Sequence, residues 1–418
     1  MEMKKVIKIT MKGGNVLRRS SLCLMAMLLC VGVLMSGVKV QTVRASIITV
    51  PDDYSTIQAA INAASPGDTI YVRNGVYQEH LELNKTVTLM GESNLYTCIT
   101  SEILSEEVPD GIYITASNCT LENFNITCID PKANGVVFVD GADTGCSDTL
   151  VLNNTIASGY DTTLLTFQGS SFNRAEGNQI IMTSDVTTGI AVVLSSSYNI
   201  VDYNNITGGY IGVAIDFADN NTVSNNYITE QVPFDFGLSP NLDGALYLGV
   251  TSGDLIRENT FVNNSLSLNF GLEVSNVQFY HNNIINDSQQ PILQSDAQIS
   301  LDNGYPSGGN YWSNYKGTDA YSGVYQNVTG QDGIGDSPYA VNAKNIDLYP
   351  LMQPYHHLIG DLNDDGRVGL DDLTAFAWSF ESTPGMPNWN SQADFNGNGV
   401  VDLADLVTLA LHYGQHEP

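Results

Sequence analysis

The chain has 418 residues, of which 45 are acidic and 16 are basic, and its formal net charge is −29 at pH 7. A surface this acidic repels nucleic acid and anionic lipid and attracts divalent cations. It also repels an acidic polysaccharide unless a cation such as Ca²⁺ lies between the two.

The N-terminal segment has the organisation of an export signal. Six Lys and Arg residues in the first 19 positions precede an apolar run, Leu22–Val38, and Val43–Ala45 fits a small-residue cleavage site. We expect residues 1–45 to form a signal peptide, so that the protein is secreted or held at the cell surface. An uncleaved anchor is the alternative, because the 17-residue run is at the short limit for spanning a bilayer. No other run is long enough, and cleavage leaves 8 basic and 44 acidic residues, a net charge of −36.

A short amphipathic helix is expected next. Ser55–Gln58 has the pattern of a capping box, and Pro66-Gly67 ends the element. The apolar residues at helical spacing are Ile57, Ala60, Ile61 and Ala64. Such a helix would cover the open end of a stack of strands, where unpaired edges favour aggregation. The first strands are predicted at Ile70–Val72 and Val87–Leu89.

One short phrase recurs through the middle of the chain and aligns as three columns. The Asn column is Asn154, Asn178, Asn204, Asn226, Asn259 and Asn282, with Phe124 in the first turn. The first apolar column is Ile126, Ile156, Ile180, Ile206, Ile228, Phe261 and Ile284, and the second is Leu121, Val151, Ala175, Val201, Val223, Ile256 and Phe279. The Asn spacings of 24, 26, 22, 33 and 23 residues are typical of a solenoid.

The segments between the phrases are short and rich in β-forming residues, as at Gly189–Leu194, Gly212–Ile215 and Gly244–Leu248. The pattern predicts a mainly β fold, a parallel β-helix with both apolar columns inside. Stacked Asn amides can hydrogen-bond from one turn of the coil, or rung, to the next. We therefore interpret the Asn column as structural.

The four cysteines after the signal are Cys98, Cys119, Cys128 and Cys146. None lies in a CxxC pair, which argues against a zinc or redox motif. An exported chain can form disulfides, so two bridges and four buried free thiols are both compatible with the sequence, and the three pairings cannot be ranked.

A candidate catalytic pair lies after the second apolar column. The outward positions there are Glu122, Leu152, Glu176, Asp202, Ser224, Arg257 and Tyr280. Glu176 and Asp202 would lie one rung apart, near the carboxylate spacing of retaining glycosidases. The alternative is a solvated acidic face, because paired acids without substrate-positioning groups are common in so acidic a chain.

The segment from about Ile48 to Met352 resembles the NosD-like branch of the pectin-lyase-like superfamily. The Asn-rich rungs carry the resemblance together with Pro66–Val72, Gly309–Tyr315, Asp332–Tyr339 and Asp347–Leu351. It implies a right-handed parallel β-helix with a closing segment over residues 46–352. Relatives on this fold include pectate lyases, polygalacturonases and pectin esterases, but their paired-Asp and Gly-His-Gly signatures are not found here. The NosD name is tied to copper, yet His80, His281, Met90 and Met182 are scattered, so we do not expect a copper site.

Two twelve-residue loops near the C-terminus have the oxygen pattern of a Ca²⁺ loop. Oxygen-bearing side chains occupy positions 1, 3, 5 and 12, Gly occupies position 6, and position 7 offers its carbonyl. The predicted ligands are Asp361, Asn363, Asp365, Arg367 (backbone) and Asp372 in the first loop, and Asp394, Asn396, Asn398, Val400 (backbone) and Asp405 in the second. A third Ca²⁺ site is conceivable at Asp332/Asp336, where the sequence favours a hydrogen-bonded Gly turn.

Each loop is followed by an apolar stripe at helical spacing. The stripes are Leu373, Phe376, Ala377 and Phe380, and, 33 residues later, Leu406, Leu409, Ala410 and Tyr413. We expect two amphipathic helices. Val368 and Val401 occupy position 8 of the loops, where the facing loops are expected to pair as short strands.

This duplicated arrangement resembles the dockerin family over residues 361–414, after a short linker at 353–360. The resemblance implies a small α-helical module with paired EF-hand-like loops that binds a cohesin. Family contacts centre on loop positions 10 and 11, which are Leu370, Asp371, Leu403 and Ala404 here. A Ca²⁺-stabilised cap without a partner is the alternative.

Two functions are compatible with the sequence. The first is an extracellular scaffold or carbohydrate-binding β-helix, attached through a Ca²⁺-dependent dockerin to a cohesin-like domain. The second is a polysaccharide lyase or glycoside hydrolase carried by the same module. Expected partners are therefore a cohesin and a polysaccharide or surface glycan, with no nucleic acid and no membrane contact beyond the signal segment.

Overall fold

The computed structural model describes most of the chain after the predicted signal peptide. The described residues are 45–101, 110–128, 135–160, 162–183, 189–232, 244–271, 273–289, 291–293, 299–356, 358–363, 367–383, 386, 388–396 and 399–415. The predicted signal peptide lies outside them except for Ala45. Within these ranges, no helix combines the length and the apolarity needed to cross a bilayer.

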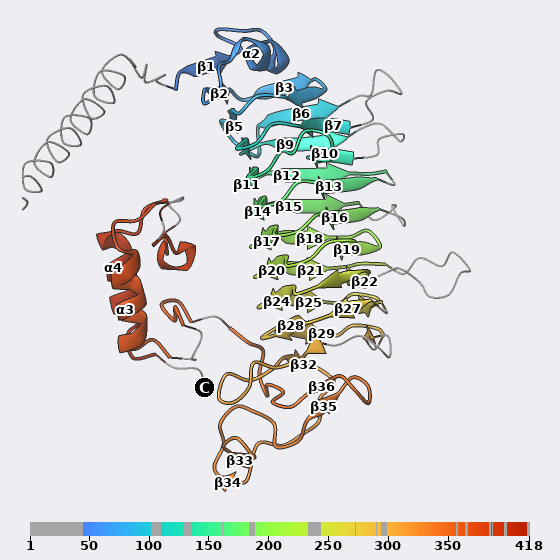
Figure 1. The fold of residues 1–418 in the computed structure, drawn as a ribbon, viewed down its shortest axis with the longest axis vertical. Helices are drawn as coiled ribbons and strands as arrows, with labels where there is room; N and C mark the ends of the chain where they lie inside the picture. The colour runs from blue at the N-terminus through green and yellow to red at the C-terminus, as the bar shows by residue number, and fades with distance from the viewer. Residues whose placement is uncertain are drawn as a thin grey trace, which may run out of the picture. The chain divides into compact units, whose positions relative to one another are not determined.

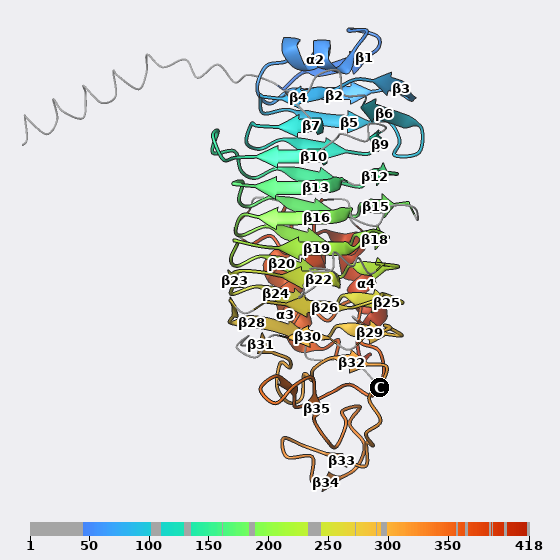
Figure 2. The same cartoon turned by 90° about the vertical axis from the view of Figure 1, so that its right-hand side faces the viewer.

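The strands form a parallel β-helix, which confirms the predicted architecture (Figure 1). Each rung adds one strand to each of three sheets, and the strands of one sheet stack parallel along the coil (Figure 2). Sheet A contains β1 (Ile47–Val50), β2 (Thr69–Val72), β5 (Thr88–Gly91), β8 (Thr120–Glu122), β11 (Leu150–Leu152), β14 (Arg174–Glu176), β17 (Ile200–Asp202), β20 (Thr222–Ser224), β24 (Leu255–Arg257), β28 (Val277–Tyr280) and β31 (Ile299–Ser300).

The other two sheets follow sheet A in each rung. Sheet B contains β3 (Gly75–Gln78), β6 (Thr97–Ser101), β9 (Asn125–Cys128), β12 (Thr155–Ser158), β15 (Gln179–Met182), β18 (Asn205–Thr207), β21 (Tyr227–Thr229), β25 (Thr260–Val262), β29 (Asn283–Ile285) and β32 (Tyr311–Trp312). Sheet C contains β4 (Leu81–Leu83), β7 (Asp110–Ile114), β10 (Gly135–Asp140), β13 (Thr163–Gln168), β16 (Ile190–Ser195), β19 (Ile211–Ile215), β22 (Gly244–Leu248), β26 (Leu268–Phe270) and β30 (Ile292–Leu293). A short parallel pair, β23 (Thr251–Ser252) and β27 (Val274–Ser275), lies at a turn.

The register places both predicted apolar columns inside the coil. Val151 pairs with Leu121 and Ala175 in sheet A, and Ile156 pairs with Ile126 and Ile180 in sheet B. Every member of the two columns is buried. Because side chains alternate across a strand, one inward residue in each short strand fixes which residues face solvent.

The predicted Asn column forms a continuous ladder. The Oδ1 atom of Asn204 accepts hydrogen bonds from the backbone N–H of Asn178 (2.9 Å) and from its Nδ2 atom (2.9 Å). The same pair of bonds repeats from Asn204 to Asn226 and onward, and the ladder gains one member, Asn310, that the sequence pattern did not include. Each buried turn thereby satisfies its polar groups, as a structural ladder requires.

A second ladder was not predicted. The backbone N–H groups of Thr149, Asn173 and Asn199 donate to the Oδ1 atoms of Asn173, Asn199 and Asn221, each at 2.9 Å. Its Asn residues lie five positions before Asn178, Asn204 and Asn226. That constant offset was the available signal, and the two ladders flank the three-residue strands of sheet A.

The ladders end on aspartates. The second ladder ends where Asn221 N–H donates to Asp254 Oδ1 (2.8 Å), and the first ends where Asn310 N–H donates to Asp347 Oδ2 (2.8 Å). A shorter third row, in which Gln231 N–H donates to Asn264 Oδ1, ends where Asn264 N–H donates to Asp287 Oδ1 (2.9 Å). A carboxyl group accepts hydrogen bonds from the preceding rung without needing a further rung as acceptor. Burial raises the pKa of Asp254 and of Asp287 to about 6 and that of Asp347 to about 7.

The capping helix is present as α2 (Ile57–Ala63), next to β1 and β2 at the start of the coil (Figure 1). Its predicted apolar face, Ile57, Ala60, Ile61 and Ala64, is buried. The predicted cap is displaced by one residue, because Thr56 rather than Ser55 accepts from the N–H of Ala59. The Glu79 carboxylate accepts from the N–H groups of Ile57 and Gln58 at 2.9 Å each and so completes the first turn.

The closing segment follows β32 and contains two antiparallel pairs. They are β33 (Tyr321–Ser322) with β34 (Val328–Thr329), and β35 (Tyr339–Ala340) with β36 (Ile346–Asp347). Asp347 holds this segment to the last rung, since its Oδ2 atom also accepts from Trp312 Nε1 (2.9 Å) and its Oδ1 atom from the N–H of Tyr349 (3.1 Å).

The C-terminal module contains the two predicted helices, α3 (Leu370–Ser379) and α4 (Leu403–His412), and a 3₁₀ turn, η1 (Ser391–Ala393). Its core is the set Leu362, Val368, Phe376, Ala393, Val401 and Leu409. The helix stripes are only partly as predicted, because Ala377 and Ala410 are exposed while Phe380 and Tyr413 stand at the C-caps.

The predicted pairing of Val368 with Val401 is wrong. The backbone of Val368 instead pairs with Gly414 and Gln415 after α4, and that of Val401 pairs with Glu381 and Ser382 after α3. Each loop is thus hydrogen-bonded to the chain that follows the helix of the other repeat. Both valines are buried. Position 8 of each loop therefore pairs with the chain that follows the opposite helix, and the backbones of the two valines do not pair with each other.

Candidate functional sites

The outward column of sheet A is arranged as predicted. Glu176 pairs in register with Leu152 on one side and with Asp202 on the other, so the two candidate carboxylates lie one rung apart. Ser224, Arg257 and Tyr280 continue the column. Strands of three residues direct two side chains each away from the coil interior, which places these groups in one narrow strip, where Asp202 and Ser224 are nevertheless buried.

Arg174 joins the two carboxylates. Its Nε atom lies 2.5 Å from Glu176 Oε2 and its Nη2 atom lies 3.0 Å from Asp202 Oδ2. Arg174 is two residues before Glu176 on β14 and therefore on the same face. The sequence analysis did not include Arg174 in the candidate site, although its spacing of two residues from Glu176 was the signal that could have joined it to the pair.

Asp202 lies in a less solvated position than Glu176. Its carboxyl group also accepts from Ser224 Oγ (2.9 Å) and Asn225 Nδ2 (3.1 Å). Burial raises the pKa of Asp202 above its ordinary value, although Arg174, Asn225 and Ser224 act in the opposite direction. The strip therefore presents fixed, partly neutralised hydrogen-bond acceptors.

The two Ca²⁺ loops hold their last carboxylates inside the module. Asp372 Oδ1 accepts from the N–H of Leu362 (2.8 Å), and its Oδ2 atom accepts from the N–H of Gly369 (2.6 Å). Asp405 accepts in the same way from the N–H of Asn396 (3.2 Å) and of Asp402 (2.9 Å). Both carboxylates, at the third position of α3 and α4, are buried.

The first positions of the loops are also placed. Asp361 is buried, and Asp394 Oδ2 accepts from the N–H of Gly399 at 2.8 Å. This bond closes the loop between positions 1 and 6. The predicted ligands Asp365 and Asn398 lie outside the described residues. The other predicted ligands, Asn363, Arg367, Asn396 and Val400, are exposed.

The predicted partner contacts are exposed on one side of each helix. Leu370 is 67% exposed and Leu403 is 66% exposed, and their neighbours Asp371 and Ala404 are exposed as well. The sequence analysis missed the continuation of these two faces. They extend at intervals of four residues through Thr374 and Trp378 on α3 and through Val407 and Leu411 on α4.

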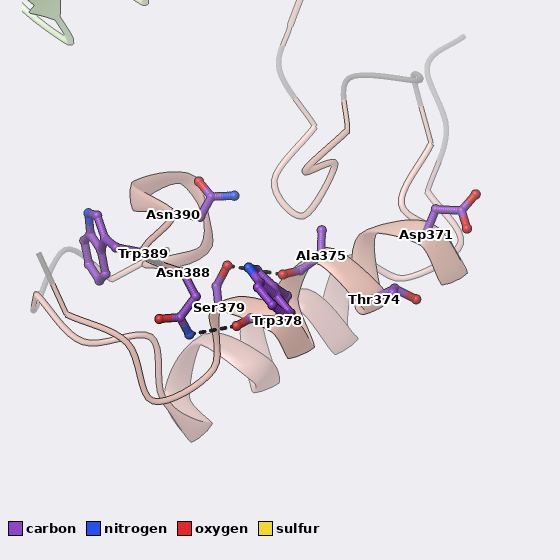
Figure 3. Close-up of a pocket in the computed structure, with 8 residues that line it drawn as sticks. All are labelled: Asp371, Thr374, Ala375, Trp378, Ser379, Asn388, Trp389 and Asn390. Atoms are coloured by element: carbon purple, nitrogen blue, oxygen red, sulfur yellow. Dashed lines mark hydrogen bonds between the residues drawn. The ribbon is translucent and has the colours of Figure 1, made fainter. Parts of the chain in front are cut away.

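A shallow groove of about 530 Å³ runs along α3 beside residues 388–390 (Figure 3). It is lined by Asp371, Thr374, Ala375, Trp378, Ser379, Asn388, Trp389 and Asn390. Asn388 Nδ2 donates to the carbonyl of Trp378 at 2.9 Å, which holds the segment against the helix. The exposed face of α3 therefore has a hollow with one exposed Trp beside it.

The Asp332/Asp336 turn uses its carboxylates for backbone contacts. Asp336 accepts from the N–H groups of Ala320 (3.0 Å) and Tyr321 (2.9 Å), and Asp332 Oδ2 accepts from the N–H of Gly323 (3.2 Å). Partial burial acts to raise the pKa of Asp336, but these N–H donors lower it overall. The third Ca²⁺ site stays a prediction.

None of the four cysteines at positions 98, 119, 128 and 146 forms a disulfide in this structure. Cys119, Cys128 and Cys146 are buried and Cys98 is partly buried. Burial raises the pKa of the Cys119 thiol to about 11, so it is protonated at neutral pH. Of the two states left open by the sequence, the structure contains the reduced one.

Comparison with known proteins places the coil in a family. Residues 61–317 match the family described as periplasmic copper-binding protein (NosD). Among solved structures, a pectate lyase Pel9A is similar with 12% identity and a TM-score of 0.42, covering 75% of this chain and 91% of that one. Carrot pectin methylesterase (11% identity, TM-score 0.38, 62% of this chain and 89% of that one) and the pectin methylesterase PemA from Erwinia chrysanthemi (12%, 0.33, 61% and 92%) are also similar.

A search of curated proteins gave no match. The family match covers more than half of the chain and spans the ladders, the sheet A strip and most of the apolar columns. The protein therefore belongs to the NosD family and folds as a parallel β-helix.

Proposed function

We propose that the protein is an extracellular or envelope glycan-binding β-helix that is attached through a Ca²⁺-dependent dockerin module to a cohesin-like partner. The observation that carries the proposal is the duplicated loop and helix of residues 361–414, in which Asp372 and Asp405 are buried at equivalent points. A membership in a family described as periplasmic supports a location outside the cytoplasm.

The donor set of the two loops fits Ca²⁺. Position 12 is an aspartate held by backbone N–H groups in both repeats, and the position 1 aspartate of the second repeat, Asp394, accepts from the N–H at position 6. A hard divalent cation such as Ca²⁺ prefers carboxylate and carbonyl oxygen ligands of this kind. We propose that each Ca²⁺ would be held by the ligands that the loop pattern predicts.

The docking proposal rests on the two equivalent apolar faces. Monomeric surfaces rarely present two aligned rows of large apolar side chains, such as Leu370/Trp378 and Leu403/Val407/Leu411. Because α3 and α4 are related by the 33-residue repeat, each of them offers a similar apolar face to a partner. Trp is enriched among the few residues that supply most of the binding energy of an interface, which makes Trp378 the expected anchor.

Copper does not fit the described residues. No group of three or more His, Cys, Asp or Glu side chains with metal-binding geometry occurs in the described part of the chain. His281 stacks on Tyr355 with ring centroids 4.0 Å apart and its Nε2 atom contacts the carbonyl of Ser307, while Met182 is buried in β15. We therefore derive no function from the copper in the family's description.

A polysaccharide lyase or glycoside hydrolase is the second candidate. Its supporting observation is that Asp202, with a raised pKa, lies one rung from Glu176. Arg174 contacts both carboxylates, however, which favours a binding role over a free acid and nucleophile. Release of reducing sugars from neutral and acidic glycans, lost in Glu176→Gln and Asp202→Asn, would establish this alternative.

Calorimetric titration of the secreted chain, residues 46–418, tests the metal part. After chelator treatment we expect two Ca²⁺ per chain. Asp372→Ala and Asp405→Ala should each remove one site, whereas Asp371→Ala, a matched exposed neighbour, should leave two. Two sites retained in the double variant would contradict the assignment.

Recovery of partners from the native cell envelope tests the docking part. The chain should retain a protein partner in Ca²⁺ and release it with chelator. Trp378→Ala combined with Leu411→Ala should lose the partner without losing Ca²⁺. Retention that is insensitive to both changes would refute docking through these faces.

A further inference from the structure

Two columns of left-handed residues run beside sheet A. In every described rung from β11 to β24, the residue before each ladder position has a positive φ. The first column is Asp148, Phe172, Tyr198, Asn220, Gly253 and Asn276, and the second is Asn123, Asn153, Gly177, Tyr203, Asn225, Glu258 and His281. The left-handed region favours Gly, Asn and Asp, which account for most members of both columns.

The coil imposes this backbone whatever the side chain. Asp148 N–H donates to the carbonyl of Ser171, Tyr198 N–H to that of Asp219, and Asn220 N–H to that of Ser252. The left-handed geometry is thus fixed by hydrogen bonds between adjacent rungs. An aromatic residue at such a position adds strain and gives the turn nothing that Asn would not give.

Three aromatic residues nevertheless occupy these positions in adjacent rungs. Phe172 and Tyr198 stack with ring centroids 5.3 Å apart and planes 11° apart, and they are 59% and 51% exposed. Tyr203 lies at the other end of β17 and is 49% exposed. Burial raises the pKa of Tyr203 to about 12, with Asp202 and Glu258 acting in the same direction, so its hydroxyl stays protonated and can donate.

The same two rungs carry the Arg174, Glu176 and Asp202 cluster. Phe172 and Arg174 flank one ladder residue on the β14 rung, and Asp202 and Tyr203 are adjacent on the β17 rung. The aromatic stack, the ion cluster and the phenol therefore lie across one strip of sheet A. Within these two columns, Phe and Tyr occur only on the two rungs that also carry the strip's fixed polar groups.

The chemistry of this strip fits an uncharged sugar chain. Aromatic faces contact the C–H faces of sugar rings, and the partly exposed carboxylate of Glu176 and the phenol of Tyr203 can hydrogen-bond sugar hydroxyl groups. Arg174 is already paired with both carboxylates, so it is not available to recognise a sugar acid. The acidic chain would also repel a polyanion.

We propose that Phe172, Tyr198 and Tyr203, together with Arg174, Glu176 and Asp202, form a binding strip for a neutral polysaccharide on the outer face of sheet A. The proposal rests on the glycan-binding function proposed above and gives it a site and a class of ligand. Phe172 and Tyr198 form the stacking platform, and the polar cluster orients hydroxyl groups beside it.

The test is native affinity electrophoresis of residues 46–418 in gels that contain one soluble polysaccharide. Neutral β-glucan and galactomannan should be compared with polygalacturonate and alginate, in Ca²⁺ throughout. We expect retardation in at least one neutral glycan and none in the two acidic ones. The variant Phe172→Asn/Tyr198→Asn should weaken binding on the order of tenfold or more.

The choice of Asn separates binding from folding. Asn occupies the same column at Asn220 and Asn276, so the double variant should keep or raise the thermal midpoint. Phe172→Tyr should retain binding, and Tyr325→Ala, at an 84% exposed aromatic in the closing segment, should leave it unchanged. Loss of stability without loss of binding would mean that the stack is structural and would overturn the proposal.

The outcomes also separate this site from the general function. If the wild type binds neutral glycans and the Asn variant binds equally well, the strip is wrong and the glycan-binding function stands. If no glycan retards the wild type, both are wrong. Retardation only by polygalacturonate or alginate would retain glycan binding but refute the neutral class.

Discussion

Buried aspartates behave differently in the coil and in the C-terminal module. In the coil, Asp347 ends a ladder, accepts three hydrogen bonds and has a pKa raised by burial to about 7. In the module, Asp372 and Asp405 are equally buried at loop ends that repeat the spacing of Ca²⁺ ligands. The first environment favours the protonated acid, whereas the second is suited to the ionised acid with a cation. Burial alone therefore does not reveal what a carboxylate does.

The two regions also differ in how much core supports them. The coil buries its apolar columns continuously from Val50 to Trp312, whereas the module's core has six buried apolar residues in the described chain. A core that small provides little stability without a further constraint. Under the Ca²⁺-binding proposal, metal binding would supply folding free energy in the module but not in the coil.

Removal of Ca²⁺ should have the largest effect, and only in the module. With chelator, amide hydrogen exchange in α3 and α4 should increase to near the unfolded rate, while strands such as β16 keep their protection. Hydrogen exchange read by mass spectrometry checks this. Equal protection of both helices with and without Ca²⁺ would remove the proposed contrast.

Gly309→Ala should be the most damaging single change in the coil. A methyl group there would lie 1.9 Å from Asp347 Oδ1, whose carboxyl group is fixed by three hydrogen bonds. We expect a loss on the order of 3 kcal/mol or more in the free energy of unfolding, measured by denaturant titration. Gly159→Ala, whose added methyl meets only Thr183 Oγ1 at 3.3 Å, is the control and should change little.

Stability of the closing segment should fall as pH rises from about 4 to about 7. The pKa of Asp347 is raised from 3.8 to about 7, so between these values the folded state binds more protons than the unfolded state. At about 1.4 kcal/mol per pKa unit, the loss across this range is at most about 4 kcal/mol. Asp254 and Asp287, with pKa values near 6, act in the same direction.

Asp347→Asn should flatten that pH dependence, at some loss of stability because Asn has one acceptor oxygen. Thermal melts from pH 4 to pH 8 compare the two chains. The melts are recorded in chelator, so that Ca²⁺ binding by the module does not contribute. A wild-type melting midpoint that rises from pH 4 to pH 8 would show that Asp347 does not control the pH dependence.

Asn204→Ala should destabilise the coil by an intermediate amount. It removes the acceptor for the N–H of Asn178 and the donor to Asn226 Oδ1, which leaves buried polar groups without partners. The expected loss is about 2–4 kcal/mol. Asn205→Ala, its neighbour on β18, is the control, and equal losses in both variants would mean that the ladder is not the cause.

Glu176→Gln should have the smallest effect on stability. Its side chain is 37% exposed, and pairs this accessible contribute at most about 1 kcal/mol. Thermal denaturation checks this. A larger loss would show that the Arg174 cluster supports the coil rather than serving a ligand.

Repetition made most of the coil predictable. The 22- to 33-residue spacing, the two apolar columns and the Asn ladder were all visible in the sequence, because each rung repeats the same local pattern. The second ladder was missed because its run of Asn has only three members, with Thr149 before it and Asp254 after it. The role of Asp347 was missed because it lies 37 residues from Asn310.

The sequence by itself determined which residues face inward, where the rungs begin and which side chains carry the oxygen pattern of the C-terminal loops. Local periodicity is enough for these, because a strand or helix face follows from the spacing of apolar residues. Only the tertiary structure decided that Arg174 joins Glu176 to Asp202, that the loops pair with the chain after the helices, and that aromatic residues gather beside one strip. These contacts join residues from different rungs or repeats, and their partners depend on register, which no single segment encodes.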